Sequence, residues 1–293
     1  MAATDTFNYA QAFAGNIGLL TPDEQTRLRQ ATVAIPGMGG VGGAYLVTLA
    51  RLGVGRFVIA DDDTFELRNI HRQSGATMQT LGRPKVDVMA EMARAINPEL
   101  DLRIVRDAIR HNNIDAFLSG CDLVLDGLDF FHIAARRLLF QRARATGLTV
   151  ITCGPMGFSA ALLIFTPTGP SFDEFMAIDD GMSELEQLAR FAVGLAPAAL
   201  HLAYMDRSTI SLKEQRGPAC AIAMNLCAAV AATEALHVLL KRRAPWSVPR
   251  YAQFDTYRMR YRRGTLRLGN RHPWQRVKLW YLKHQLRHDF ARP

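Results

Sequence analysis

The chain of 293 residues has only four cysteines and contains no C-x-x-C pair. Four cysteines in a chain of this length do not make a disulfide framework, and they cannot supply the two C-x-x-C pairs of a common structural zinc site. We therefore expect no zinc, and we expect the protein in a reducing compartment, the cytoplasm.

Long apolar runs are missing too. The longest candidate for a membrane span is residues 218–240, and four polar side chains interrupt it: Asn225, Thr233, Glu234 and His237. We expect no membrane span there. Residues 1–14 contain Asp5 but neither a basic start nor an apolar stretch, so they do not resemble a signal peptide. No internal repeat or low-complexity segment is evident.

Acidic residues are scarce at one end of the chain. Residues 241–293 hold 15 Lys and Arg against 2 Asp and Glu, whereas the other 240 residues hold 20 against 25. The formal net charge of +8 therefore combines a mildly acidic core with a basic C-terminal segment.

The strongest motif lies in residues 33–43, where a short apolar run breaks on glycines and leads into an expected helix over residues 40–52. Three glycines fit the pattern G-x-G-x-x-G: Gly37, Gly39 and Gly42. They permit a tight turn, close approach to a phosphate, and packing of the helix on its strand. A second expected strand ends at Asp61, where an acid suits a ribose hydroxyl. This indicates an adenine nucleotide; a glycine-rich turn that serves only packing is the alternative.

Strand and helix signals alternate beyond this motif. Strands are expected over residues 56–60, 102–105, 123–125 and 148–152, and helices over residues 84–96, 112–118 and 131–145. The alternation predicts an α/β fold with a Rossmann-like, doubly wound and mostly parallel sheet, helices on both faces and ligands at the carboxyl ends of the strands. Residues 159–165 are expected to extend the sheet as an antiparallel strand.

We divide the chain into four segments. They are an N-terminal helical segment (1–31), a nucleotide-binding α/β domain (32–170), an irregular segment with a buried helix that completes the core (171–240), and a basic C-terminal extension (241–293). In the extension, alternating aromatic and basic residues around Gly264 predict a β-hairpin over residues 251–268, and residues 274–290 are expected to form a basic helix.

Three further motifs follow the glycine loop. Residues 61–73 read DDDTFELRNIHRQ, residues 81–86 read LGRPKV, and residues 125–129 read LDGLD. Together the four motifs resemble the ThiF/MoeB/HesA branch of the ubiquitin-activating-enzyme superfamily, whose members show D-x-D-x-V-x-x-x-N-x-x-R-Q, then G-x-x-K, then D-x-x-D. Phe65 stands where the family usually has Val. The resemblance covers about residues 16–167 and recurs more weakly in residues 217–240.

The resemblance implies ATP-dependent activation of a carboxylate, which attacks the α-phosphorus of ATP, releases pyrophosphate and becomes an acyl-adenylate. By position, it assigns the ribose to Asp61, the phosphates to Asn69, Arg72 and Lys85, and Mg²⁺ to Asp129. One carboxylate suffices, because Mg²⁺ fills its shell with water and phosphate oxygens. Arg72, Lys85 and Asp129 are the expected catalytic residues. The implied nucleotide-binding set also includes Gly37, Gly39, Gly40, Gly42, Asp63 and Gln73.

Purely structural roles for these residues remain possible alternatives. Arg72 could be a surface arginine that pairs with the acids at 61–63, and Asp129 could cap the helix expected near Phe131. Lys85 at a helix start is poorly placed for the helix dipole, which favours a ligand role. Cys220, also at an expected helix start, is the candidate for a reactive thiol, and inert burial is the interpretation of the other three cysteines.

One part of the family pattern is absent. Members usually carry two arginines before an I-G-L-L stretch, and one of them reaches the ATP of the partner subunit. This chain has Ala12 and Gly15 at those positions. Losing one such charge donor typically costs about 2.7–4 kcal/mol of transition-state stabilisation. Either Arg68 or Arg83 compensates, or turnover is weak.

Partners follow from the resemblance and from the basic extension. The resemblance implies a homodimer and a carboxylate on a small protein, a peptide or a small molecule. Basic residues interleaved with aromatic ones are typical of nucleic-acid or anionic-surface binding, of an acidic protein partner, or of aromatic rings packed on the core with their charged neighbours in water. The sequence does not decide between these.

Three rival functions stay open. An NAD-dependent oxidoreductase explains the glycine loop and Asp61, but it gives no role to Arg72, Lys85 and Asp129 together. A non-catalytic or partner-dependent subunit of the same fold is favoured by the missing arginines. A tRNA-directed dehydratase of the same superfamily would suit the basic extension.

Overall fold

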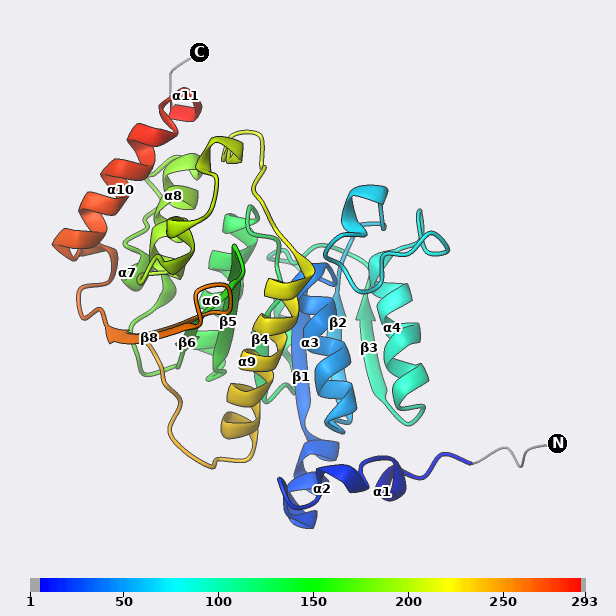
Figure 1. Ribbon diagram of the computed structural model, residues 1–293. Helices are drawn as coiled ribbons and strands as arrows, with labels where there is room; N and C mark the ends of the chain where they lie inside the picture. Colours follow the sequence, from blue (N-terminus) through cyan, green and yellow to red (C-terminus); the bar gives the residue numbers. More distant parts are fainter. Residues whose placement is uncertain (1–5, 291–293) are drawn as a thin grey trace.

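The computed structural model describes residues 6–290 of the chain, with side chains to residue 288. The first five residues of the expected N-terminal segment, Asp5 among them, and the last three of the basic extension lie outside the described residues. The centre is an eight-stranded sheet with the order β3-β2-β1-β4-β5-β6-β7-β8 (Figure 1). The strands are β1 (Thr32–Pro36), β2 (Arg56–Ala60), β3 (Asp101–Val105), β4 (Leu123–Asp126), β5 (Val150–Met156), β6 (Ser159–Phe165), β7 (Arg250–Asp255) and β8 (Arg260–Thr265).

The first five strands in this order pair in parallel, and β5 to β8 pair antiparallel. The longer helices are α2 (Pro22–Gln30), α3 (Gly40–Arg51), α4 (Lys85–Ile96), α6 (Ile133–Ala145), α8 (Glu184–Leu195), α9 (Ala221–Leu239) and α10 (Pro273–Gln285). The shorter ones are α1 (Tyr9–Ala12), α5 (Ile114–Leu118), α7 (Phe172–Met176) and α11 (Arg287–Phe290). The predicted α/β class and the antiparallel strand at 159–165 are confirmed.

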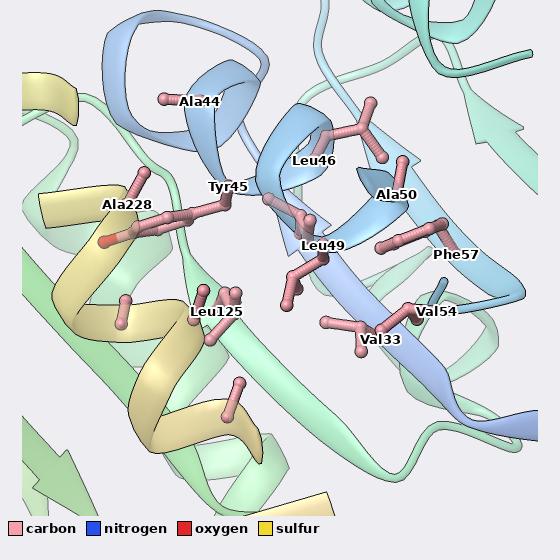
Figure 2. Close-up of a cluster of buried hydrophobic side chains, with 14 of the residues drawn as sticks. Val33, Ala44, Tyr45, Leu46, Leu49, Ala50, Val54, Phe57, Leu125 and Ala228 are labelled. Atoms are coloured by element: carbon pink, nitrogen blue, oxygen red, sulfur yellow. The ribbon is translucent and has the colours of Figure 1, made fainter. Parts of the chain in front are cut away.

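Two apolar cores lie on opposite faces of the sheet, because successive residues of a strand point to opposite sides. In β1, Val33 and Ile35 join the core formed with α3, α4 and α9, whereas Ala34 joins the core formed with α5, α6, α7 and α8. Figure 2 shows part of the first core, where Tyr45 of α3 reaches toward Ala228 of α9. Helices therefore cover both faces, as predicted.

Helix α9 has 19 residues and is, by length and composition, apolar enough to cross a membrane. In this fold it packs against α3, β5 and β6 instead, and its buried alanines belong to the first core. The approach to α3 is close, because a Cβ added to Gly40 would lie 2.8 Å from the Sδ of Met224. Its apolar composition serves the packing of a core helix.

The basic extension continues the main sheet, and three details differ from the predictions. Strands β7 and β8 form the expected hairpin, but the turn lies at residues 256–259, and Gly264 pairs with Tyr251 inside the ladder. A Cβ on Gly264 would lie 2.6 Å from the Tyr251 ring, so this glycine makes room for the ring. The helix expected over residues 274–290 is divided into α10 and α11, and β5 runs to residue 156 instead of 152.

The N-terminal helices α1 and α2 lie at the end of the sheet opposite to the carboxyl ends of the parallel strands (Figure 1). Thr21 and Glu24 cap α2 reciprocally, as their spacing predicts. The Glu24 carboxylate also accepts hydrogen bonds of 2.7 and 2.6 Å from Arg242, just beyond α9. The bond from Arg242, followed by that from the Thr21 backbone, lowers the pKa of Glu24 to about 2.

We predict that Glu24→Gln lowers the melting temperature by about 2–4 °C near neutral pH, because it removes the ion pair with Arg242, while a glutamine oxygen can still accept the capping bond from the Thr21 N–H. The pKa of Glu24 lies below its ordinary value of 4.5, so its stabilisation is complete above about pH 4.5 and is lost as the pH falls toward 2. The difference in melting temperature from the native chain should therefore narrow between about pH 6 and pH 3. A constant difference across this range would contradict the assignment.

Candidate nucleotide-binding site

The sequence-predicted residues gather at the carboxyl ends of β1, β2 and β4. The chain leaves β1 toward β2 and β3 on one side, whereas β4 leads to β5 on the other, so the strand order reverses between β1 and β4. Crossovers that diverge in this way leave a crevice at the carboxyl ends, where α/β proteins bind ligands. The glycine loop follows β1, residues 61–63 follow β2, and residues 127–129 follow β4.

The loops after β1 and β4 touch backbone to backbone through glycines. Gly37 has a φ of +86°, and a Cβ there would lie 2.3 Å from the carbonyl oxygen of Gly127. A Cβ on Gly42 would lie 1.8 Å from the carbonyl oxygen of Gly37. The predicted turn and packing roles of Gly37 and Gly42 agree with this geometry. Gly127 is equally constrained, although the sequence pattern did not single it out.

Gly39 differs from Gly37 and Gly42 because a Cβ there would make no steric clash. A Cβ there would meet only the Gln73 side chain, at 3.5 Å or more. Gly39 is the N-cap residue of α3, and no side chain caps this helix, so its first N–H groups are available to a ligand or water. The Oε1 atom of Gln73 is buried and has no hydrogen-bond partner among the described residues. An uncapped helix start beside an unsatisfied buried acceptor fits a polar ligand.

The acids after β2 hold the glycine loop and a lysine. Asp61 Oδ2 accepts a hydrogen bond of 2.6 Å from the Met38 N–H, and Oδ1 accepts one of 2.8 Å from the Asp63 N–H. Burial raises the pKa of Asp61, and these two hydrogen bonds oppose the shift. The Nζ of Lys85 lies 2.8 Å from Asp63 Oδ2, with the lysine side chain 8% exposed and that of Asp63 62% exposed. The side chain of Lys85 is therefore buried, and its ammonium group lies at Asp63, in the loop after the carboxyl end of β2.

Arg72 does not pair with the acids at 61–63. Its Nη1 donates to the carbonyl oxygen of Arg68 at 3.0 Å, the one hydrogen bond of its guanidinium within the described part of the chain. Burial lowers the pKa of Arg72, and the charge of Asp129 opposes the shift while that of Arg68 adds to it. A half-buried guanidinium with most of its donors unused, close to an acid and another cation, is suited to hold a multiply charged anion.

Asp129 follows β4 by three residues and is exposed. Its Oδ1 accepts a hydrogen bond of 3.0 Å from the Phe131 N–H and closes a local turn, but Asp129 does not cap α6, whose N-cap residue is His132 and which has no side-chain cap. Helix α6 itself starts at Ile133. The second oxygen, Oδ2, makes no hydrogen bond within residues 6–288 and is available to a cation.

Asn69 closes the short 3-10 helix η2 (Leu67–Asn69). Its Oδ1 accepts a hydrogen bond of 2.9 Å from the Glu66 N–H, and the side chain is buried. The oxygen therefore shapes the loop that carries Arg72, while the Nδ2 group has no hydrogen-bond partner in the described chain.

Sequence reasoning missed Arg136, which organises the loop around Asp129. Its Nε lies 2.8 Å from Asp126 Oδ2, and the two side chains are 3% and 1% exposed. The same guanidinium donates to the carbonyl oxygens of Leu128, Asp129 and Phe130 at 2.7, 3.1 and 3.2 Å. The signal in the sequence is the ten-residue spacing from Asp126, but nothing there shows that the pair is buried.

The remaining candidates each have a partner in the described chain. Arg83 is held by Glu91 at 2.5 Å, and Arg68 pairs with Glu66 at 2.5 Å. Cys220 is the N-cap residue of α9 and its Sγ approaches the Gly157 carbonyl oxygen at 3.5 Å. Within the described residues, no group of three or more His, Cys, Asp or Glu side chains could hold a metal. A cation at Asp129 would therefore need most of its ligands from a substrate and water.

The fold and site define a Rossmann-like α/β protein with the glycine loop typical of nucleotide binding. Residues 13–277 match the ThiF family, and the chain belongs to this family.

Two curated relatives match about half of the chain. It is 38% identical over 151 residues to the tRNA threonylcarbamoyladenosine dehydratase of Haemophilus influenzae, covering 51% of this chain and 57% of that protein. It is 32% identical over 145 residues to the sulfur carrier protein ThiS adenylyltransferase of Escherichia coli, covering 50% of this chain and 57% of that one. The chain thus spans little more than half the length of these relatives.

Solved structures extend the likeness of fold over most of the chain. The crystal structure of E. coli MccB with ATP matches with a TM-score of 0.60 at 19% identity, covering 84% of this chain and 66% of that one. At this identity the likeness concerns the fold alone.

We predict that two glycine substitutions separate binding from folding. Gly39→Ala should leave the melting temperature within about 2 °C but weaken nucleotide binding about tenfold or more, because its methyl occupies the space for a phosphate. Gly42→Ala should lower the melting temperature by several degrees, because its methyl would overlap the Gly37 carbonyl. Calorimetry and thermal unfolding measure both; strong nucleotide binding by the folded Gly39→Ala variant would contradict the site.

We also predict that Arg136→Met destabilises the fold by about 3–5 kcal/mol, because it leaves Asp126 buried without its partner. The matched control is Arg137→Met on the same helix, whose ion pair with Asp173 is partly exposed and should cost less. Chemical denaturation compares the two. The double variant Asp126→Asn/Arg136→Met should recover part of the loss; no recovery would argue against the buried pair as its source.

Proposed function

We propose that the protein is an ATP-dependent adenylyltransferase that activates a carboxylate as an acyl-adenylate and releases pyrophosphate. The observation that best supports this is the grouping of Arg72, Lys85 and Asp129 around the glycine loop. A dinucleotide-binding oxidoreductase uses the loop and Asp61 but gives no role to Arg72, Lys85 and Asp129 together. The ThiS adenylyltransferase among the relatives and the ATP-bound MccB among the structural neighbours support the same reaction.

The chain's own residues suit this reaction. The amides at the start of α3 and the glycine loop would hold the phosphates, and Asp61, Gly40 and Gln73 would border the nucleoside. A substrate carboxylate oxygen bonds to the α-phosphorus, the bond from that phosphorus to the bridging oxygen breaks, and its electron pair leaves with pyrophosphate. Arg72 and Lys85 would stabilise the charge that collects on the phosphates.

Lys85 can change partners at little cost. Its present partner, Asp63, is 62% exposed, so water can replace the lysine at that carboxylate, and the phosphates would replace the carboxylate at Nζ. Asn69 would add its free Nδ2 group toward the phosphates. Mg²⁺ bound at Asp129 would supply charge neutralisation on the triphosphate, with phosphate oxygens and water completing its shell.

We propose Arg68 as the cation that compensates for Ala12 and Gly15. Arg83 is drawn toward Glu91, whereas Arg68 lies next to Arg72 and affects its pKa. The N-terminal segment is at the far end of the sheet from its own glycine loop (Figure 1). This segment would approach a nucleotide only if that nucleotide were bound to a second copy of the chain, so we propose a homodimer. Light scattering would measure its mass in solution.

The acceptor class follows from the relatives' names and from the chemistry. One relative adenylylates a sulfur carrier protein, so we propose a carboxylate at the end of a small protein or peptide, or on a small molecule. The cytoplasm, the source of ATP, Mg²⁺ and such acceptors, is the proposed compartment. We also propose that the four segments defined from the sequence (1–31, 32–170, 171–240 and 241–293) are the functional units of this enzyme.

The central test is exchange of labelled pyrophosphate into ATP with Mg²⁺ and candidate acceptors. Exchange that depends on an acceptor supports an adenylyltransferase. Tight NADH binding without exchange would favour the oxidoreductase, and exchange that needs a second protein chain in addition to the acceptor would favour a partner-dependent subunit.

We predict that Asp129→Ala reduces the exchange rate by about 100-fold or more while leaving the fold intact, because Asp129 is exposed and makes one local hydrogen bond. Arg72→Ala should weaken ATP binding far more than AMP binding, because the arginine is assigned to the phosphates that AMP lacks. Arg83→Ala is the matched control and should change neither. Unchanged exchange in Asp129→Ala, or equal weakening of ATP and AMP in Arg72→Ala, would remove that residue from the mechanism.

A further inference from the structure

The outward face of α10 carries apolar side chains that the fold leaves uncovered. Trp274, Val277, Trp280 and Tyr281 are 70, 53, 66 and 38% exposed. Their spacing of three to four residues places them on one side of the helix, opposite to the buried Leu279. Two exposed tryptophans on one helix face are unusual for a surface without a partner.

A hollow of about 460 Å³ lies beside this face, between α10, α8 and the 3-10 helix η5 (Gly269–Arg271). It is lined by Arg190, Asn270, Arg271, Arg276, Leu279, Trp280 and Lys283. Figure 1 shows α10 and α8 side by side at the end of the molecule away from α3 and the nucleotide site.

The hollow has more cations than the fold neutralises. Glu186 pairs with Arg190 at 2.8 Å and also with Lys283, so one carboxylate is shared between two cations. The guanidinium of Arg276 makes no hydrogen bond or ion pair with any residue from 6 to 288. Among the described residues, the guanidinium of Arg271 donates only to the carbonyl oxygen of Glu174, at 3.3 Å. Positive charge therefore remains for an anion.

Trp280 provides a flat surface at the rim of the hollow. Its ring is stacked on His284, with centroids 5.6 Å apart and planes 8° apart. This contact orients one face of the indole and leaves the ring mostly exposed. An aromatic surface next to unneutralised guanidinium groups has the two features that bind a base and its phosphate together.

We propose that a single-stranded nucleic acid binds at the hollow beside α10, with a phosphate on Arg271 and Arg276 and a base stacked on Trp280, and that Trp274 lies outside its contact. The hollow favours this ligand over a membrane, because Arg190 and Arg271 line a recess beneath the helix that a flat bilayer surface reaches poorly. An acidic protein would match the charge but has no need of the exposed indole. The surface is separate from the nucleotide site, so this inference is independent of the proposed adenylyltransferase activity.

The test is fluorescence anisotropy of labelled RNA and DNA strands of about 12 nucleotides with the full chain, at salt between about 50 and 200 mM. We expect affinity to fall linearly with salt on a logarithmic plot. Trp280→Ala should weaken binding about fivefold or more, through the loss of stacking. Arg276→Ala should weaken binding and reduce the salt slope by about 0.7, the value for one phosphate contact of a single strand.

Two matched controls accompany these variants. Trp274→Ala removes an equally exposed tryptophan that does not line the hollow, and Arg94→Ala removes an exposed arginine on α4; both should leave binding within about twofold. Thermal unfolding should show all four variants folded. Absence of binding, or equal losses for Trp274→Ala and Trp280→Ala, would overturn the proposal. So would binding to phosphatidylserine vesicles that outcompetes both nucleic acids.

Discussion

The buried ion pair between Arg136 and Asp126 is the constraint on which the candidate site depends. Asp126 ends β4 in the middle of the sheet, where a charge needs a partner, and Arg136 supplies it from the first turn of α6. The remaining guanidinium donors satisfy three loop carbonyls that helix and sheet leave unpaired. An apolar pair at these positions would remove the donors of the Leu128 and Phe130 carbonyls and leave that of Asp129 only the His132 N–H, so the charges fix the loop geometry as well as neutralising one another.

That loop geometry fixes two parts of the site at once. It places Asp129 at the edge of the crevice, and it brings Gly127 against Gly37 and Gly42. The turn after β1 can follow its tight path only because the turn after β4 presents backbone there and no side chain. The glycine loop and Asp129, the acid for which we propose Mg²⁺, are thus held by the same contacts, although the sequence separates them by about 90 residues.

The sequence predicted the parts that depend on local patterns. Short apolar runs, the capped start of α2 and the glycine loop each carry their signal within about a dozen residues. Gly127 and Arg136 escaped notice because their roles arise from contacts across strands. Gly264 was misread for the same reason: as a local signal it indicates a turn, whereas in the structure it makes room for a ring on the neighbouring strand.

The basic extension is joined to the rest of the fold by polar contacts, and these contacts fix the positions of its charges. Asn270 donates to the carbonyl oxygens of Met176 and Arg190, and Gln253 of β7 donates to Ser159 of β6 at 2.8 Å. A disordered basic tail would spread its charge over many conformations, and ordering it would cost about 1–2 kcal/mol per residue on binding. Here the fold has already fixed Arg271 and Trp280 on either side of one hollow. In the nucleic-acid complex that we propose, the cations would therefore act as a preorganised surface, whose affinity for an anion would be set by geometry rather than by net charge alone.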